Sequence, residues 1–274
     1  MASEKSQTSQ QSKTELSQYQ KYIKNVRKAV FTVGFNRSGS SLIGDLLSAH
    51  PNIVMDNESG IIRRYVSGEF TSRESLLSFI IKHDMDRGNK KNYVAGQYQQ
   101  HYDCNIEVVG DKHSPHNTVF LTKTESNTLE ELEKFIKLPI RLLFNVRNPY
   151  DMVASMVNSI PDWRRSQNQK IKKAISFFTR RSADNMKLID QVSADQIFMI
   201  RLEDFIASPE RMLSDICDFL SIAKTSEYLS DCAAVTYKVP KRTRDTLDWD
   251  EEHERELDAL IEKYEFFNGY SRDA

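Results

Sequence analysis

One segment, residues 28–50, limits the folds open to this chain more than any other. It begins with the apolar, β-branched run A-V-F-T-V-G, and such a run ending at a glycine is typical of a buried strand. The stretch S-S-L-I-G-D-L-L-S-A-H follows shortly after and has apolar residues at helical spacing, which predicts a helix. A strand, a glycine-bearing loop and a helix, in that order, form a framework in which α/β proteins bind phosphate.

The loop within this segment, G-F-N-R-S-G-S-S at residues 34–41, has the chemistry of an anion site. Gly34 and Gly39 are five positions apart, which is the spacing of a phosphate-binding loop. Backbone N–H groups at the start of the helix are expected to converge on the anion, aided by the helix dipole. Those groups belong to Ser38, Gly39, Ser40 and Ser41.

The cation of this loop argues against the most familiar class of phosphate-binding proteins. P-loop kinases and NTPases place a lysine directly after the second glycine, whereas this chain has Ser40 there and Arg37 two positions before Gly39. A P-loop kinase or NTPase, or a non-catalytic nucleotide-binding scaffold, is therefore the alternative function. A serine N-cap beside a solvated arginine is a simpler explanation, but it requires neither two glycines nor a cation.

Further short apolar runs extend this unit to a whole domain. Buried strands are expected near 106–110, 140–146 and 196–200, with a weaker candidate at 52–55. The stretches between them have helical patterns at 72–83, 126–136, 150–160, 167–191, 209–221 and 250–264. Strands that alternate with helices predict an α/β, P-loop-like three-layer fold: a central parallel sheet flanked by helices, with ligands at the carboxyl ends of the strands.

Length and composition favour one domain without a global basic field. Residues 1–14 are polar and are expected to form a disordered tail, and 15–27 a helical lead-in, so the domain is assigned to 15–274. The net charge of −1 disfavours wholesale binding to nucleic acid or anionic membrane. No apolar run is long enough for a membrane span or an export signal. The three cysteines lack C-x-x-C spacing and suit a reducing compartment, so we expect a cytoplasmic protein.

A second anion site is expected in the run N-V-R-N-P-Y-D-M-V-A-S. Arg147 stands where a buried strand ends, and Pro149 fits the first turn of a helix because it lacks an N–H group. Ser155 comes eight positions after Arg147, so the guanidinium and the hydroxyl can bind the same phosphate. An ion pair between Arg147 and Asp151 is the simpler alternative. Two anion sites at the ends of parallel strands suit a ligand phosphorylated in two places.

These motifs resemble those of the sulfotransferases that use 3′-phosphoadenosine 5′-phosphosulfate (PAPS). Residues 34–51 are similar to the family's 5′-phosphosulfate loop, in the R-S-G-S form of the carbohydrate and tyrosylprotein enzymes, and residues 145–155 to its 3′-phosphate motif. The segment L-E-D-F-I-A-S-P at 202–209 resembles a third motif, and the bacterial sulfotransferase-domain proteins resemble the chain most. The resemblance implies direct in-line transfer of a sulfonate group from PAPS to an acceptor hydroxyl or amine, with a general base and no metal.

Two features of the donor site follow only from this resemblance. The tyrosine of the family's usual Y-E-D segment, which packs on adenine in some relatives, is Leu202 in this chain. The residue that stacks on the adenine is therefore unassigned. The run V-P-K-R-T-R-D-T stands where the family often has a basic loop near the 3′-phosphate. Arg242 and Arg244 are carried over as candidate ligands of that phosphate.

Two residues compete for the role of general base. Glu58 follows the H-P pair in H-P-N-I-V-M-D-N-E, which resembles the tyrosylprotein sulfotransferase stretch whose glutamate acts as base. His113, in G-D-K-H-S-P-H, stands where cytosolic relatives have a catalytic histidine, and its unperturbed pKa suits a base at neutral pH. Lys112 is a candidate for stabilising the bridging oxygen or the sulfonate. The sequence leaves the choice between Glu58 and His113 open.

The acceptor is less defined than the donor. Residues 60–104 and 158–185 are expected to form its walls, with Arg, Lys, Tyr and Trp163 among them. Such a mixture is compatible with a small molecule, a saccharide, a phenol, a peptide tyrosine or a lipid head group. The oligomeric state is not encoded in any feature of the sequence.

Overall fold

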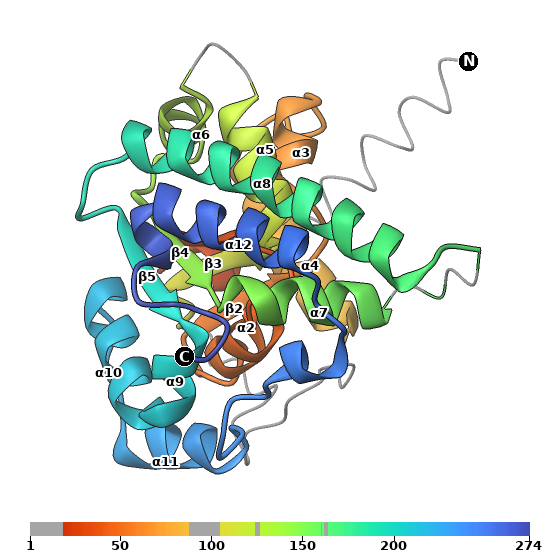
Figure 1. The fold of residues 1–274 in the computed structure, drawn as a ribbon. Coiled ribbons are helices and arrows are strands. Elements are labelled where there is room, and N and C mark those ends of the chain that lie inside the picture. Colours follow the sequence, from red (N-terminus) through yellow and green to blue (C-terminus); the bar gives the residue numbers. More distant parts are fainter. Residues whose placement is uncertain (1–18, 88–104, 124–126, 160, 162–163) are drawn as a thin grey trace.

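A five-stranded parallel sheet forms the centre of the structure, a computed structural model that describes residues 19–87, 105–123, 127–159, 161 and 164–274 (Figure 1). The strands are β1 (Lys28–Gly34), β2 (Ile53–Asn57), β3 (Val108–Lys112), β4 (Ile140–Val146) and β5 (Ile197–Arg201). Their order is β2-β3-β1-β4-β5, and all four pairings are parallel. The expected α/β class with a central parallel sheet is confirmed.

The apolar sequence of the central strands explains why they pair. All seven residues of β1 are buried, as expected for a parallel strand covered on both faces. Since β1 lies between β3 and β4, the loop that follows β1 comes close to the carboxyl ends of both neighbours. Gly34, the last residue of β1, is in register with Asn145 of β4. The two sequence motifs for anion binding therefore lie side by side.

Helices cover both faces of the sheet (Figure 1). Their bounds are α2 Ser40–Ser48, α3 Ile61–Val66, α4 Arg73–Arg87, α5 Ser114–Thr122, α6 Thr128–Ile136, α7 Pro149–Ser159, α8 Gln167–Gln191, α9 Leu202–Ala207, α10 Pro209–Leu220, α11 Ser226–Ala234 and α12 Glu251–Lys263, with short 3₁₀ turns η2 Thr243–Thr246 and η3 Glu265–Phe267. In the described part of the chain, no helix is long and apolar enough to span a membrane.

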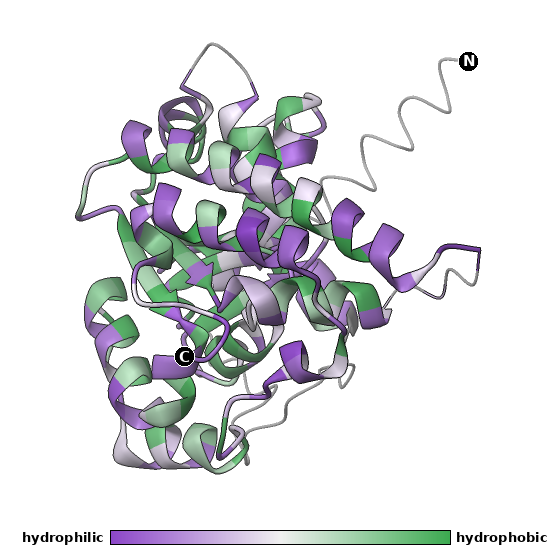
Figure 2. Cartoon of the chain, in the orientation of Figure 1, coloured by the Kyte–Doolittle hydropathy of each residue, from purple (hydrophilic) through white to green (hydrophobic). Residues whose placement is uncertain are grey.

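The two faces have separate apolar cores because side chains alternate along each strand. Phe31 and Val33 pack with α4, α5, α8 and α12, whereas Val30 packs with α2, α10 and α11. Hydrophobic residues gather at the sheet and hydrophilic residues cover much of the outer helices (Figure 2).

The observed strands and helices differ from the expected ones mainly in two kinds of segment: a strand that contains ionisable residues and short helices. The strand expected at 106–110 is shifted to Val108–Lys112, because Asp111 and Lys112 continue the pairing with β2 although both are charged. The short helices α3, α5, α9 and α11 were not expected. The described part of the lead-in is helical at residues 19–23, and the polar tail at 1–14 lies outside the described residues.

Candidate active site

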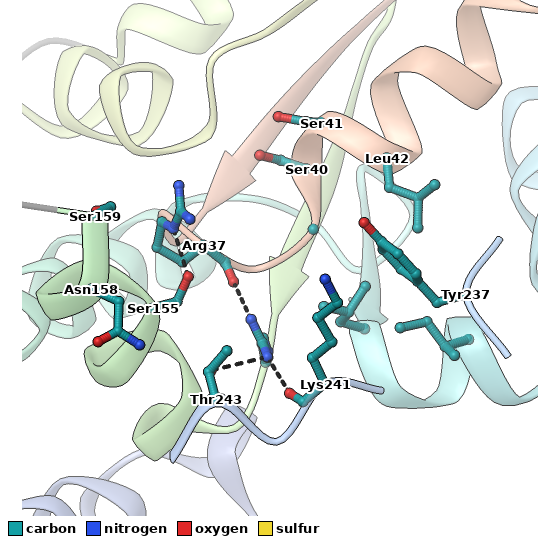
Figure 3. A pocket seen from close by; sticks show the side chains of 14 residues that line it. Arg37, Ser40, Ser41, Leu42, Ser155, Asn158, Ser159, Tyr237, Lys241 and Thr243 are labelled. Atoms are coloured by element: carbon teal, nitrogen blue, oxygen red, sulfur yellow. Dashed lines mark hydrogen bonds between the residues drawn. The ribbon is translucent and has the colours of Figure 1, made fainter. Parts of the chain in front are cut away.

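A cavity of about 460 Å³ lies where the segments after β1, β4 and β5 meet (Figure 3). Six residues expected from the sequence line it: Arg37, Gly39, Ser40, Ser41, Arg147 and Ser155. The expected Ser38 does not; it is fully buried, and its hydroxyl donates to the carbonyl of Phe35 at 2.6 Å. The position of the cavity agrees with the rule that ligands bind at the carboxyl ends of parallel strands.

The loop at 34–41 has a backbone that most residues avoid. Gly34 and Gly39 have φ angles of 104° and 85°, and Arg37 has a φ of 64° despite its side chain. A Cβ atom on Gly39 would lie 2.4 Å from Cδ1 of Leu202, so only glycine fits there. Non-glycine residues in this region carry strain and concentrate at functional sites. The loop thus brings the first turn of α2 to the cavity with no side chain at its N-cap.

The two expected anion sites form one continuous surface. Nε of Arg37 donates to Oγ of Ser155 at 2.8 Å, and Nη1 of Arg147 donates to the carbonyl of Arg37 at 3.3 Å (Figure 3). Burial lowers the pKa of Arg147, an effect that the charges of Asp151 and Glu203 oppose. An arginine nonetheless stays protonated in proteins. The cavity therefore presents two guanidinium groups and a hydroxyl to a ligand.

The segment after Arg147 is held by a carboxylate from another motif. Oε1 of Glu203 accepts from the backbone N–H of Asn148 at 3.0 Å, while its Oε2 accepts from the hydroxyl of Tyr270 at 2.6 Å. The side chain of Asn148 donates to the carbonyl of Ser271 at 2.7 Å. The E-D segment and the C-terminal G-Y pair, which the sequence shows far apart, thus brace the same turn.

Arg242 and Arg244 do not join the cavity. Arg244 is buried, forms a 3.2 Å ion pair with Asp151 and donates to the carbonyls of Ser271 and Arg272. Arg242 pairs with Asp245 at 3.3 Å and also binds C-terminal carbonyls. Neither side chain lines the cavity in this structure, and their expected role at the 3′-phosphate stays a prediction. The sequence showed a cluster of cations but not the carbonyls and carboxylates that turn the side chains away.

The lining residues that the sequence did not assign to the donor site include Asn158, Tyr237, Lys241 and Thr243. Thr243 accepts from Nη2 of Arg147 at 3.3 Å, and the carbonyl of Lys241 accepts from the same nitrogen. Tyr237 is 42% exposed, unusually high for a large apolar side chain. The run V-T-Y-K-V-P contained the only available signal, an aromatic residue just before the basic loop.

A buried lysine connects the cavity to the candidate base: Lys112 contacts both Ser41, which lines the cavity, and Glu58. Nζ of Lys112 lies 2.7 Å from Oε1 of Glu58 and donates to Oγ of Ser41 at 3.0 Å. The Lys112 side chain is only 4% exposed, whereas that of Glu58 is 59% exposed. Burial raises the pKa of Glu58, but the hydrogen bond and charge of Lys112 outweigh it, and the net pKa is below the ordinary value. The ammonium group of Lys112 is thus shared between the loop at 34–41 and the candidate base Glu58.

Gly44 makes room for this lysine. A Cβ atom at position 44 would lie 2.7 Å from Cγ of Lys112, so the side chain crosses α2 where the helix has no side chain of its own. Glycine inside a helix costs about 0.5–1 kcal/mol relative to alanine. A glycine inside the helical pattern S-S-L-I-G-D-L-L is the sequence signal of this close approach.

His113 lies in an environment that disfavours its protonated form. It lies at the N-cap of α5, with its ring centroid 4.1 Å from that of His116 and its Nδ1 buried without a hydrogen-bond partner. Burial, with the charges of His116, Lys112 and Arg63, lowers the pKa of His113 to about 4. The imidazole is therefore neutral at physiological pH, but it is a weak proton acceptor.

The acceptor walls are only partly visible. Residues 88–104, 160 and 162–163 lie outside the described residues, and Trp163 is among them. The described part of the expected walls includes α3, α4 and most of α8.

Known sulfotransferases match the chain in sequence pattern and in fold. A sulfotransferase family model matches residues 29–226. The sulfotransferase domain from the curacin biosynthetic pathway is 16% identical, with a TM-score of 0.53 over 88% of this chain and 99% of that one. A mouse sulfotransferase complexed with PAP is 12% identical, with a TM-score of 0.51 over 86% of this chain and 84% of that one. No curated protein matches the chain significantly.

Lys112→Met is expected to raise the pKa of Glu58, because it removes the cation that lowers this pKa while burial remains. Carboxyl carbon shifts followed by NMR across the acid range measure the change. Lys123→Met is the matched control, since Lys123 is exposed at the C-cap of α5. An unchanged titration of Glu58 in Lys112→Met contradicts the contact between the two residues.

Proposed function

Because the chain belongs to the sulfotransferase family, we propose that it transfers a sulfonate group from PAPS to an acceptor hydroxyl or amine. The observation that carries this proposal is the continuous surface from Arg147 and Ser155, through the loop at 34–41, to Lys112 and Glu58. One end of a bisphosphorylated nucleotide can bind the guanidinium groups of this surface. The other end can bind at the start of α2. The mouse relative complexed with PAP supports this choice of donor.

The 3′-phosphate of the donor is assigned to Arg147 and Ser155, with Arg37 beside them. A charge-assisted hydrogen bond contributes about 1.5–3 kcal/mol, and a planar guanidinium binds phosphate with two parallel bonds. Asp151 is shared between two arginines, because its carboxylate is 3.9 Å from the guanidinium of Arg147 and 3.2 Å from that of Arg244. Arg147 therefore keeps its charge available for a ligand.

The 5′-phosphosulfate is assigned to the first turn of α2, where Gly39, Ser40 and Ser41 line the cavity. Backbone N–H groups and the helix dipole favour an anion there. Lys112 reaches the same turn from β3 through Ser41. It is thereby close enough to stabilise the charge that develops on the bridging oxygen as the sulfur–oxygen bond breaks.

The adenine base is assigned to the apolar side of the cavity. Leu202, Ile206 and Tyr237 line that side, and Figure 3 shows Tyr237 across the cavity from Arg37 and Ser155. Tyr237 is partly exposed, and an aromatic ring is suited to stacking on a base. Tyr237 thereby takes the role of the tyrosine that Leu202 replaces.

Glu58 is assigned as the general base. Its φ of 63° is strained for a glutamate, and Lys112 links it to the donor loop through hydrogen bonds to Glu58 and Ser41. In the reaction, the acceptor oxygen or nitrogen attacks sulfur, the bond from sulfur to the 5′-phosphate breaks, and the acceptor proton passes to Glu58. Engagement of Lys112 with the donor would loosen its hold on Glu58 and so raise the basicity of that carboxylate.

Arg147→Ala is expected to weaken binding of 3′-phosphoadenosine 5′-phosphate by roughly tenfold to a hundredfold, since a charged hydrogen bond of about 1.5–3 kcal/mol is lost. Binding of adenosine 5′-phosphate, which lacks the 3′-phosphate, should change little. Isothermal titration calorimetry measures both. Arg242→Ala is the control, because Arg242 binds the C-terminal segment instead of lining the cavity. Equal losses for the two nucleotides in Arg147→Ala refute the 3′-phosphate assignment.

Glu58→Gln is expected to keep donor affinity while lowering kcat by roughly 10²–10⁴, the typical contribution of a general base. A transfer assay with labelled PAPS, run beside His113→Asn, measures this effect. His113→Asn should keep most of the activity. The reverse result, with normal turnover in Glu58→Gln and a large loss in His113→Asn, transfers the role to His113.

A further inference from the structure

The turn that carries Glu58 rests on two buried carboxyl groups. Oδ1 of Asp56 accepts from the backbone N–H of Asn57 at 2.7 Å, and its Oδ2 accepts from the hydroxyl of Ser59. Oδ2 of Asp111 accepts from the backbone N–H of Ile61 at 3.2 Å. The chain on both sides of Glu58 is therefore tied to these two side chains.

Asp56 and Asp111 face each other across neighbouring strands. They are register partners on β2 and β3, and both are fully buried. Adjacent strands are about 4.8 Å apart, and the side chains of register partners lie on the same face. Two carboxylates at such a separation cannot both be ionised at low cost. One proton shared by the pair removes that repulsion.

The hydrogen-bond partners of the two carboxyl groups assign the proton to Asp111. Burial and the charge of Asp56 raise the pKa of Asp111 to about 8, and Oδ1 of Asp111 has no hydrogen-bond partner in the described structure. Asp56 instead has three donors, since Nδ1 of His83 lies 2.6 Å from its Oδ1. A proton on Asp111, beside an Asp56 that accepts from its donors, agrees with all of these contacts.

Other charged groups surround the pair. His83 and the buried Asp84 lie on α4, which packs against both strands. Arg64 on α3 donates to the carbonyl of Ser59 at 2.9 Å and pairs with Glu69. Lys112 follows Asp111 but points to the opposite face of the sheet, toward α2. Among the described residues, no group of three or more His, Cys, Asp or Glu side chains is arranged to bind a metal ion.

We propose that Asp56 and Asp111 are positioning residues that share one proton and hold the turn at 57–61 so that Glu58 faces the acceptor. Glu58 has a strained backbone, and strain persists only where the surroundings over-determine it. The acid pair, with Ser59 and Ile61, supplies that constraint. This inference rests on the proposed function, because it takes Glu58 as the base.

Asp111→Asn and Asp111→Ala separate positioning from mere folding. An asparagine can accept a hydrogen bond from the N–H of Ile61 and donate one to Asp56 without a titratable proton, whereas an alanine can do neither. We expect Asp111→Ala to lower kcat by roughly 10²-fold, the cost of a displacement of about 1 Å in a catalytic group, with the KM for PAPS unchanged. Asp111→Asn should restore turnover to near the wild-type value. Asp86→Asn, exposed on α4, is the control.

The dependence of turnover on pH distinguishes a shared proton from a purely structural role of Asp111. Wild-type turnover should fall above about pH 8, where Asp111 ionises beside Asp56. Asp111→Asn should keep its turnover there, because an amide has no proton to lose. Identical alkaline limbs in the two proteins, or a loss in Asp111→Asn as large as that in Asp111→Ala, would overturn the proposal.

Thermal unfolding tests the shared proton without any assay of activity. The pKa of Asp111 is raised on folding, from 3.8 to about 8, so the wild type should lose stability as the pH rises through this range. Asp111→Asn lacks this loss. The unfolding temperature of the variant, relative to that of the wild type, should therefore increase as the pH rises from about 4 to about 8. A constant difference over that range refutes the proton on Asp111. Failure of the wild type to bind donor nucleotide instead refutes the proposed function, while the unfolding comparison still decides the state of the acid pair.

Discussion

The ammonium group of Lys112 connects the parts of the site. A buried charge is costly unless it is paired and hydrogen-bonded, and this one is satisfied by Glu58 and by Ser41. The contact requires the sheet order β2-β3-β1, which puts the strand of Lys112 between the turn of Glu58 and the loop that leads to Ser41. It also requires Gly44, since any side chain there would occupy the path of the lysine.

The anion-binding end of the cavity depends on a similar division of charges. Arg244 neutralises Asp151 and anchors the C-terminal segment, while Glu203 caps the turn after Arg147 and binds Tyr270. Both contacts use residues outside the cavity lining. Arg147 is hydrogen-bonded to two backbone carbonyls and to Thr243, while its ion pair with Asp151 is longer than the pair that Asp151 forms with Arg244. A cation held by neutral acceptors keeps its charge for a phosphate.

Much of this site could be predicted because its motifs are local. The loop at 34–41 and the Arg147–Ser155 pair depend on spacing along one strand and its following helix, which the sequence displays directly. Asp111 and Lys112 were not expected within a strand, because the partners that make their burial tolerable come from β2, α2 and α3. The ion pairs of Arg242 and Arg244 could not be predicted for the same reason: composition reveals a cation but not the group it pairs with. Tyr237 was missed because its place in the cavity depends on the packing of a distant segment.

The central claim is that the cavity binds a nucleotide phosphorylated at both the 3′ and 5′ positions. Isothermal titration calorimetry of the wild-type protein with 3′-phosphoadenosine 5′-phosphate, and separately with ATP and Mg²⁺, tests it most directly. We expect tight binding of the bisphosphate without a divalent cation and weaker binding of ATP, because Arg147 and Ser155 are proposed to bind the 3′-phosphate that ATP lacks. A preference for ATP with Mg²⁺ would contradict the account in favour of a P-loop kinase or NTPase, and binding of neither nucleotide would contradict it in favour of a scaffold.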